Sequence, residues 1–249
     1  MSPKFYFSEE RPGNDLEIVK QGTDRWRDLR RGKATASNFS RIVTEVKGEY
    51  AAGAKKYARE VAIQRMLEED TEYPIDHLPA VMRGKILEPD AVDAYHQRYG
   101  SATDAIGLVV SADETRACSP DRTSTDRLLG IEIKCPGGPV HLEYIENSGP
   151  GRQYIWQVLG SILVAKFEAW VFWSYHPGLD PVDLVYEAKN YERELELLDK
   201  ALARFEGDVQ FYCNLIRENG WEEPISRKHQ SVEDFDKLLA ADAGAWAIG

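Results

Sequence analysis

The sequence predicts an α/β fold in which a central mixed β-sheet is flanked by helices within one domain. Apolar residues recur at helical spacing in several segments before residue 100 and again at 149–166 and 191–219. Between 106 and 135, and between 168 and 188, they gather instead in short β-type runs separated by turn residues. Because helical and strand segments alternate along 249 residues, one large domain with a shared core is the simplest architecture.

Four helices are expected before residue 100, from their start and stop signals. Thr35 or Ser37 begins the second, and Pro79 opens the fourth. Pro89 inside the fourth pattern indicates either a kink or two helices meeting near Glu88. The expected ranges are 23–32, 35–43, 51–69 and 79–100.

The remainder of the chain predicts five strands and two more helices. Three short strands, expected to be antiparallel neighbours, lie at 106–112, 115–120 and 128–135. A helix at 149–166 precedes strands at 168–177 and 182–188, and a long charged helix follows at 191–219. Beyond it we expect a loosely held tail with one short helix.

Composition narrows the class of protein. The first residues lack an apolar signal-peptide region, and no run of about 20 apolar residues is present to span a membrane, so we expect a cytoplasmic protein that does not enter membranes. Three scattered cysteines, Cys118, Cys135 and Cys213, disfavour a disulfide framework, a zinc knuckle and a four-cysteine iron–sulfur cluster.

The charge is unevenly distributed. The net charge is −11, yet residues 20–65 hold twelve Lys and Arg against five Asp and Glu, a local balance of +7. Such a segment on an acidic body is able to grip nucleic-acid phosphates. Helices whose charged faces are simply solvated explain the same pattern, and both interpretations stay open here.

The segment SPDRTSTDRLLGIEIKCP, residues 119–136, carries the chemistry. Side chains alternate on a strand, so Glu132 and Lys134 share one face while Ile131 and Ile133 point to the core. A hairpin would bring the Asp121 carboxylate beside Glu132. Two carboxylates and a main-chain carbonyl suit Mg²⁺, and a lysine beside a metal-bound water suits phosphodiester hydrolysis. The alternative is a turn-capping aspartate with an exposed cross-strand ion pair.

These residues resemble a known nuclease signature. SPD…EIK resembles the PD-(D/E)xK pattern, and three further blocks, GTDRWRDLRRGKATASNF, RGKILEPDAV and YIWQVLGSILV, are similar in the same order to the lambda-phage-type exonucleases, the YqaJ-like viral recombinase family. The resemblance covers about 18–188 of a single exonuclease domain over 1–249, leaving the helix and tail at 189–249 unmatched. It implies a restriction-endonuclease-like core and a Mg²⁺-dependent 5′-to-3′ exonuclease that degrades one strand of linear double-stranded DNA and leaves 3′ overhangs.

The resemblance also implies roles for residues of the SPD…EIK segment and of the YIWQVLGSILV block. Asp121 and Glu132 correspond to metal-binding carboxylates, and Ile133 lends its main-chain carbonyl. Lys134 corresponds to the catalytic lysine. Gln157 lines the site and helps to place the attacking water.

Four residues from other blocks complete the implied site. Glu88 lies on a helix facing the same metal ions, as an indirect or outer ligand. Arg30 and Ser37 match the arginine and serine that hold the terminal 5′-phosphate, and Lys47, outside the matched blocks, is a further candidate for a phosphate contact. Ser37 at a helix start and a guanidinium are both suited to a phosphate.

Cofactors and partners follow from the resemblance alone. It implies two Mg²⁺ ions, which Mn²⁺ replaces, a homotrimeric ring around a 5′-phosphorylated duplex, and a single-strand annealing recombinase as partner in a bacterial or phage-infected cell. Three alternatives stay open: a PD-(D/E)xK endonuclease, a non-catalytic DNA-end binding module and an acidic adaptor protein.

Overall fold

A mixed β-sheet forms the centre of the protein. The computed structural model describes residues 2–10, 17–69, 78–151 and 154–220. The sheet order is β2-β4-β3-β5-β6-β7-β8, and β1 pairs with β3. The β2/β4 and β6/β7 pairs are parallel and the other pairs are antiparallel. The strands are β1 Lys4–Phe7, β2 Ala34–Thr35, β3 Thr103–Val110, β4 Arg116–Cys118, β5 Arg122–Ser124, β6 Leu129–Lys134, β7 Ala169–His176 and β8 Leu179–Glu187.

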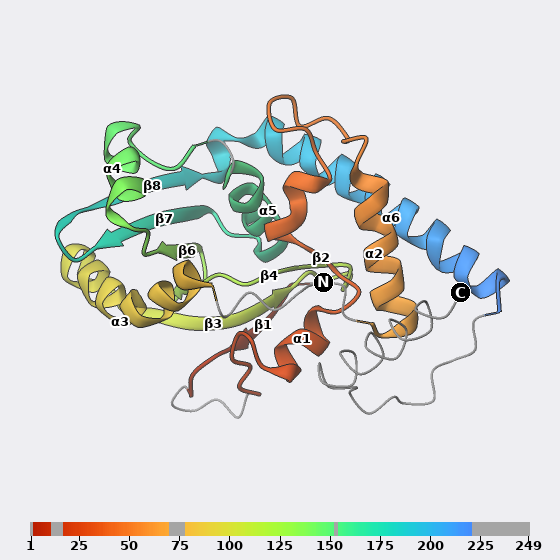
Figure 1. Ribbon diagram of the computed structural model, residues 1–249, viewed down its shortest axis with the longest axis horizontal. Helices are drawn as coiled ribbons and strands as arrows, with labels where there is room; N and C mark the ends of the chain where they lie inside the picture. Colours follow the sequence, from red (N-terminus) through yellow and green to blue (C-terminus); the bar gives the residue numbers. More distant parts are fainter. Residues whose placement is uncertain (1, 11–16, 70–77, 152–153, 221–249) are drawn as a thin grey trace, which may run out of the picture.

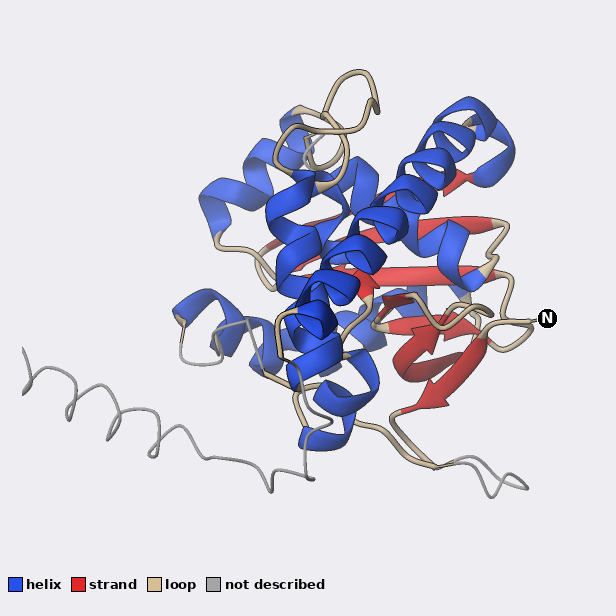
Figure 2. Ribbon diagram, turned by 90° about the vertical axis from the view of Figure 1, so that its right-hand side faces the viewer, coloured by secondary structure: helices blue, strands red, loops and turns tan. Residues whose placement is uncertain are grey.

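Helices pack on both sides of this sheet (Figure 1). Figure 2, seen from the side of α2 and α6, shows these two helices in front of the strands. Within the described residues no helix is long and apolar enough to cross a membrane. The helices are α1 Asp24–Arg30, η1 Ala36–Arg41, α2 Ala54–Leu67, α3 Pro79–Tyr99, α4 Gly138–Glu146, α5 Ile155–Ala165, η3 Ala188–Asn190 and α6 Glu192–Glu218.

Side chains alternate along a strand, so the two faces of the β6/β7 pair pack against different groups of residues. Ile131, Ile133 and Trp173 pack with apolar residues of α3 in one buried cluster. On the opposite face, Trp170 and Phe172 join the main core with residues of α2, α5 and α6. The polar residues of β6 share this second face, as the alternation predicts.

A close helix approach brings α5 against η1. A Cβ on Gly160 would lie 2.2 Å from a ring carbon of Phe39, which is much closer than two non-bonded carbon atoms can approach. Only glycine therefore allows α5 to sit at this depth. The approach brings the helix that carries Gln157 against the segment that carries Ser37.

The predicted fold class is confirmed, and most predicted elements are present. Thr23 caps α1 with its side chain, and the long C-terminal helix is α6. The predicted short helix beyond 220 lies outside the described residues. The interpretation of two helices meeting near Glu88 is wrong, because α3 runs unbroken through Pro89.

Three local predictions need correction. The segment after Thr35 is a short 3-10 helix rather than an α-helix, and Ser37 lies inside it rather than at its cap. The strands β4 and β6 are not neighbours, because β3 and the unpredicted β5 lie between them. The helix α4 was also missed, since CPGGP at its start is typical of a turn.

Candidate active site

Asp121 and Glu132 are brought together by the hairpin of β5 and β6. The Asp121 N–H donates to the Ile131 carbonyl (3.1 Å), and one carboxylate oxygen of Asp121 accepts the Ile133 N–H (2.6 Å). Burial and the neighbouring Glu132 carboxylate raise the pKa of Asp121 to about 8, against the opposing charge of Lys134. Two carboxyl groups thus meet at a place where water screens their repulsion poorly.

One oxygen of Glu132 receives two donors. Lys134 Nζ donates to Glu132 Oε1 (2.5 Å), and Gln157 Nε2 donates to the same oxygen (3.1 Å). The side chain of Glu132 is 8% exposed and that of Lys134 is 34% exposed, so this pair opens to solvent on the lysine side. Burial lowers the pKa of Lys134, but the carboxylates of Glu132 and Asp121 outweigh it and hold that pKa above its ordinary value.

The donor atoms fit a divalent cation. The N–H and C=O of one strand residue point to the same edge, so the Ile133 carbonyl lies on the edge where Asp121 accepts the Ile133 N–H. A cation beside Asp121 and Glu132 relieves the repulsion between them. The described residues contain no metal-binding group of three or more His, Cys, Asp or Glu side chains. Two carboxylates, a carbonyl and water ligands remain, a set that suits Mg²⁺.

Glu88 faces the same site from α3. Burial raises the pKa of Glu88, while the charges of Arg122 and Lys134 oppose that rise. The charge of Glu88 also contributes to the raised pKa of Asp121. Glu88 is therefore within electrostatic range of Asp121.

Arg30 and Ser37 are brought into contact at the end of α1. Arg30 Nη2 donates to Ser37 Oγ and to Thr35 Oγ1, each at 3.3 Å. Thr35 is buried, and its N–H donates to the Tyr57 hydroxyl (3.0 Å), which ties this contact to α2. The two residues matched to a phosphate pocket therefore touch, although seven positions separate them in the chain.

Trp26 connects this contact to the SPD segment. The Arg30 guanidinium lies 4.7 Å from the centre of the Trp26 ring, and Trp26 Nε1 donates to Ser119 Oγ (3.2 Å) and the Gly107 carbonyl (2.9 Å). Sequence reasoning named neither Trp26 nor Ser119 as a candidate site residue. Ser119 was detectable, since it opens the SPD motif two residues before Asp121.

Lys47 lies in an exposed loop fixed to the start of α5. Trp156 Nε1 donates to the Glu45 carbonyl (3.0 Å), and Gly48, at φ +65°, lies so close to the Trp156 ring that a Cβ there would approach it to 2.6 Å. These contacts link the Lys47 loop to the residue before Gln157 rather than to Arg30.

Part of the basic segment is neutralised by ion pairs. Three arginines of residues 20–65 form ion pairs with carboxylates within eight positions: Arg25 with Glu17, Arg27 with Asp24 and Arg31 with Asp28. Arg41 pairs with Glu60, and Arg65 pairs with Glu206 of α6. The side chains of Arg25 and Arg27 are 53% and 37% exposed, as solvated charged faces predict, whereas those of Arg31 and Arg65 are only 14% and 24% exposed.

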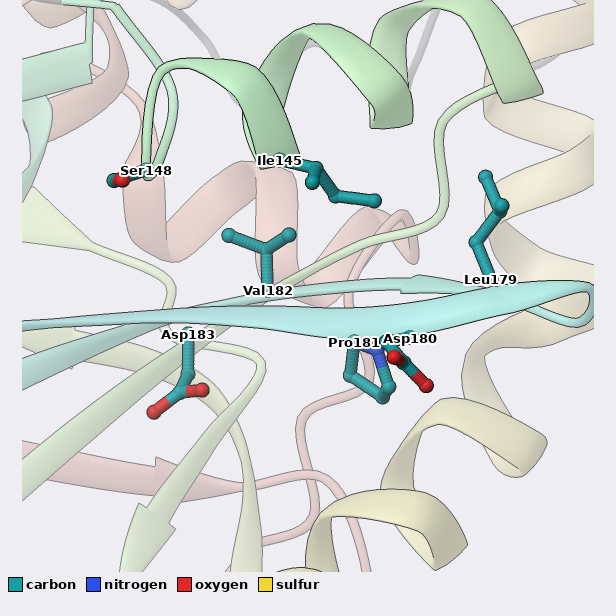
Figure 3. Close-up of a pocket in the computed structure, with 7 residues that line it drawn as sticks. All are labelled: Ile145, Ser148, Leu179, Asp180, Pro181, Val182 and Asp183. Carbon is teal, nitrogen blue, oxygen red and sulfur yellow. The ribbon is translucent and has the colours of Figure 1, made fainter.

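A pocket of about 420 Å³ lies away from these residues. It is lined by residues at the end of α4 and along β8, among them Ile145, Val182 and Asp183 (Figure 3). Two residues of α3 contact the Asp183 carboxylate: the Tyr99 hydroxyl donates a hydrogen bond to it, and Arg98 forms an ion pair with it. None of the predicted site residues lines this pocket.

Known proteins resemble this chain in sequence and in fold. The chain is similar to an alkaline exonuclease, LHK-Exo, from Laribacter hongkongensis, with 25% identity and a TM-score of 0.63 over 80% of this chain and 100% of that one. The structure of LHK-Exo in complex with dAMP matches equally well. A phage related exonuclease from Haemophilus somnus 129PT, at 17% identity and a TM-score of 0.54 over 78% of this chain and 99% of that one, shares the fold. Among curated protein sequences none matches significantly.

The predicted resemblance and the restriction-endonuclease-like core are therefore confirmed. The sequence model of the YqaJ-like viral recombinase domain matches residues 25–168, more than half of the chain. That range includes the Arg30–Ser37 contact, the Asp121–Glu132 pair and Gln157. This chain belongs to the YqaJ-like viral recombinase family, whose solved structural relatives are exonucleases of the lambda type.

Proposed function

We propose that this protein is a divalent-metal-dependent exonuclease that degrades one strand of linear double-stranded DNA from its 5′ end and leaves a 3′ overhang. The observation that carries the proposal is that Lys134 and Gln157 both donate to Glu132, while the Asp121 carboxylate is held beside them by the Ile133 N–H. The relative LHK-Exo, an alkaline exonuclease, has been solved with dAMP, a nucleoside monophosphate of the kind that an exonuclease releases.

In this proposal each residue of the site has a separate role. Asp121, Glu132 and the Ile133 carbonyl would hold one or two Mg²⁺ ions, or Mn²⁺, which supply a nucleophilic water and Lewis-acid stabilisation of the leaving 3′-oxygen. Lys134 brings a charged ammonium to a developing phosphorane charge. Gln157 orients the Glu132 carboxylate and has a second amide hydrogen with which to orient a water.

The contact of Arg30 with Ser37 supports recognition of a 5′-phosphate. A guanidinium presents a planar fork to phosphate oxygens, and Ser37 and Ser119 offer hydroxyl donors around Trp26. Capture of the terminal phosphate places the cut next to the end. Contacts of this kind go to the DNA backbone, so the base sequence is not read.

The proposal extends to assembly and location. A homotrimeric ring would keep the enzyme on its duplex, and a single-strand annealing recombinase would load on the exposed 3′ strand. Both act in the cytoplasm of a bacterial or phage-infected cell.

The proposed function is tested by digestion of a linear duplex labelled separately at each 5′ and 3′ end. In Mg²⁺ we expect 5′-labelled mononucleotides first and a surviving 3′ strand, and in chelator no release. A closed circular duplex in the same tube should stay intact. Cutting of the circle would establish the endonuclease alternative, and DNA-end binding without nucleotide release would establish the binding module. If the protein neither bound DNA nor released nucleotides, the acidic adaptor would be the remaining alternative.

Replacing Arg30 with glutamine is expected to raise the KM for 5′-phosphorylated ends at least tenfold. It should also abolish the preference over 5′-hydroxyl ends, because a charge-assisted hydrogen bond to a phosphate contributes about 1.5–3 kcal/mol. Steady-state digestion of the two kinds of duplex measures both effects. Arg27→Gln is the matched control, since Arg27 lies on the same helix and pairs with Asp24. Equal effects of the two substitutions would remove Arg30 from the phosphate site.

A further inference from the structure

Lys134 and a bound cation compete for the same carboxylate. Glu132 Oε1 accepts hydrogen bonds from both Lys134 Nζ and Gln157 Nε2. A divalent ion drawn to Glu132 repels the ammonium, and partial burial of the pair strengthens that repulsion. The ammonium therefore needs a second acceptor once a cation is bound.

Tyr154 is placed to be that acceptor. It immediately precedes α5, three residues before Gln157, so the two side chains lie on one face of this helical turn. The ring of Tyr154 lies 5.7 Å from that of Phe172. Phe172 is paired directly with Glu132 in the β6/β7 register, so it lies on the same face of the sheet as Glu132 and Lys134.

Tyr144 of α4 supports Tyr154. Its ring also lies 5.7 Å from the ring of Phe172, edge-on at 81°, so Tyr144 and Tyr154 pack against the same phenylalanine. Burial and the Tyr154 phenol raise the pKa of Tyr144 to about 12, while the charge of Lys134 opposes that rise. The charge of Lys134 interacts with both phenols, and Tyr144 stays neutral at physiological pH.

A buried histidine holds α4 in place over this face. His141 Nδ1 and Ser174 Oγ are 2.8 Å apart, and His141 Nε2 lies 2.9 Å from the Asp180 carbonyl. Ser174 is the register partner of Lys134. His141 and Tyr144 are three residues apart on α4, so one face of the helix carries both the anchor and the phenol.

We propose that the Tyr144–Tyr154 pair receives the Lys134 ammonium when a divalent cation takes Glu132. Tyr154 is then a positioning residue: it keeps the lysine side chain close to the site after its carboxylate partner has turned to the metal. The inference deepens the proposed function and rests on it, because it presupposes a cation between Asp121 and Glu132.

The test is a titration of the protein with Mn²⁺ in the absence of DNA at neutral pH. The electron paramagnetic resonance signal of free Mn²⁺ measures how much of the ion is bound. Tyr154→Phe retains the ring and its packing but removes the acceptor, and we expect it to weaken Mn²⁺ binding about tenfold. Tyr144→Phe should weaken binding less. Tyr186→Phe, which removes another buried phenol from β8, is the matched control and should bind as the unmodified protein does.

A double substitution separates positioning from general damage. In Lys134→Met there is no ammonium to accommodate, so Mn²⁺ should bind more tightly than to the unmodified protein. Adding Tyr154→Phe to Lys134→Met should then change nothing. Equal weakening by Tyr154→Phe with and without Lys134, or no weakening in either, overturns the inference. If the unmodified protein fails to bind Mn²⁺, or binds it regardless of Asp121→Ala, the proposed function itself fails, which is a distinct result.

Discussion

Asp121→Asn is expected to lower kcat on a linear 5′-phosphorylated duplex by about 10³-fold, because a lost metal ligand removes several kcal/mol of transition-state stabilisation. The substituted protein should remain folded. Asparagine still has an oxygen to accept the Ile133 N–H, and it relieves the repulsion that burial and Glu132 impose on Asp121. In the absence of metal its Tm should therefore equal or exceed that of the unmodified protein.

Single-turnover digestion and thermal unfolding in chelator measure these two effects. Asp126→Asn is the control, because Asp126 lies in the same hairpin and its carboxylate only accepts turn hydrogen bonds, from Ser124 and Leu128. We expect near-normal turnover from it. If Asp121→Asn kept a tenth or more of the turnover, Asp121 would have no place among the metal ligands.

Lys134→Ala is expected to reduce kcat by about 10²–10³-fold while DNA-end binding is retained. The loss in rate reflects removal of a fixed positive charge from the developing phosphorane. Removing the ammonium also leaves the buried Glu132 carboxylate without its ion-pair partner, so Tm in chelator should fall by about 5 °C. Mg²⁺ should raise Tm more in this variant than in the unmodified protein, because the cation then replaces the missing charge.

Lys189→Ala provides the matched control for this stability effect. Lys189 pairs with Glu187, also two residues away, but their side chains are 72% and 44% exposed, and an exposed pair contributes little to stability. Thermal unfolding of both variants with and without Mg²⁺, beside filter binding to a labelled duplex end, makes the comparison. A Lys134→Ala protein that turned over DNA normally would contradict the catalytic assignment of the lysine.

The alternation of β6 is the part of the site that sequence predicted best. A period of two places Ile131 and Ile133 on one face and Glu132 with Lys134 on the other, whatever the neighbouring strands are. The apolar stripe of α5 likewise predicted a buried helix that carries Gln157 at its edge. Both patterns are local and periodic, and burial on one side reinforces them.

Sequence reasoning failed where an element depends on distant partners. β5 is only three residues long and exists because β3 and β6 pair with it on either side. α4 begins in a run of proline and glycine, and its place depends on His141 and Tyr144 meeting β7. Propensity averaged over a few residues does not detect such contacts.

The sequence by itself determined the alternation that gathers an acid and an ammonium on one strand face, the helix that presents Gln157, and membership of a nuclease family through four ordered blocks. Only the tertiary structure decided that Gln157 and Lys134 share one oxygen of Glu132, and that Trp26 joins Arg30 to Ser119. The physical reason is range: periodicity and capping act over a few residues, whereas the Gln157–Glu132 and Trp26–Ser119 contacts join positions 25 and 93 residues apart, whose distance depends on strand register and helix packing.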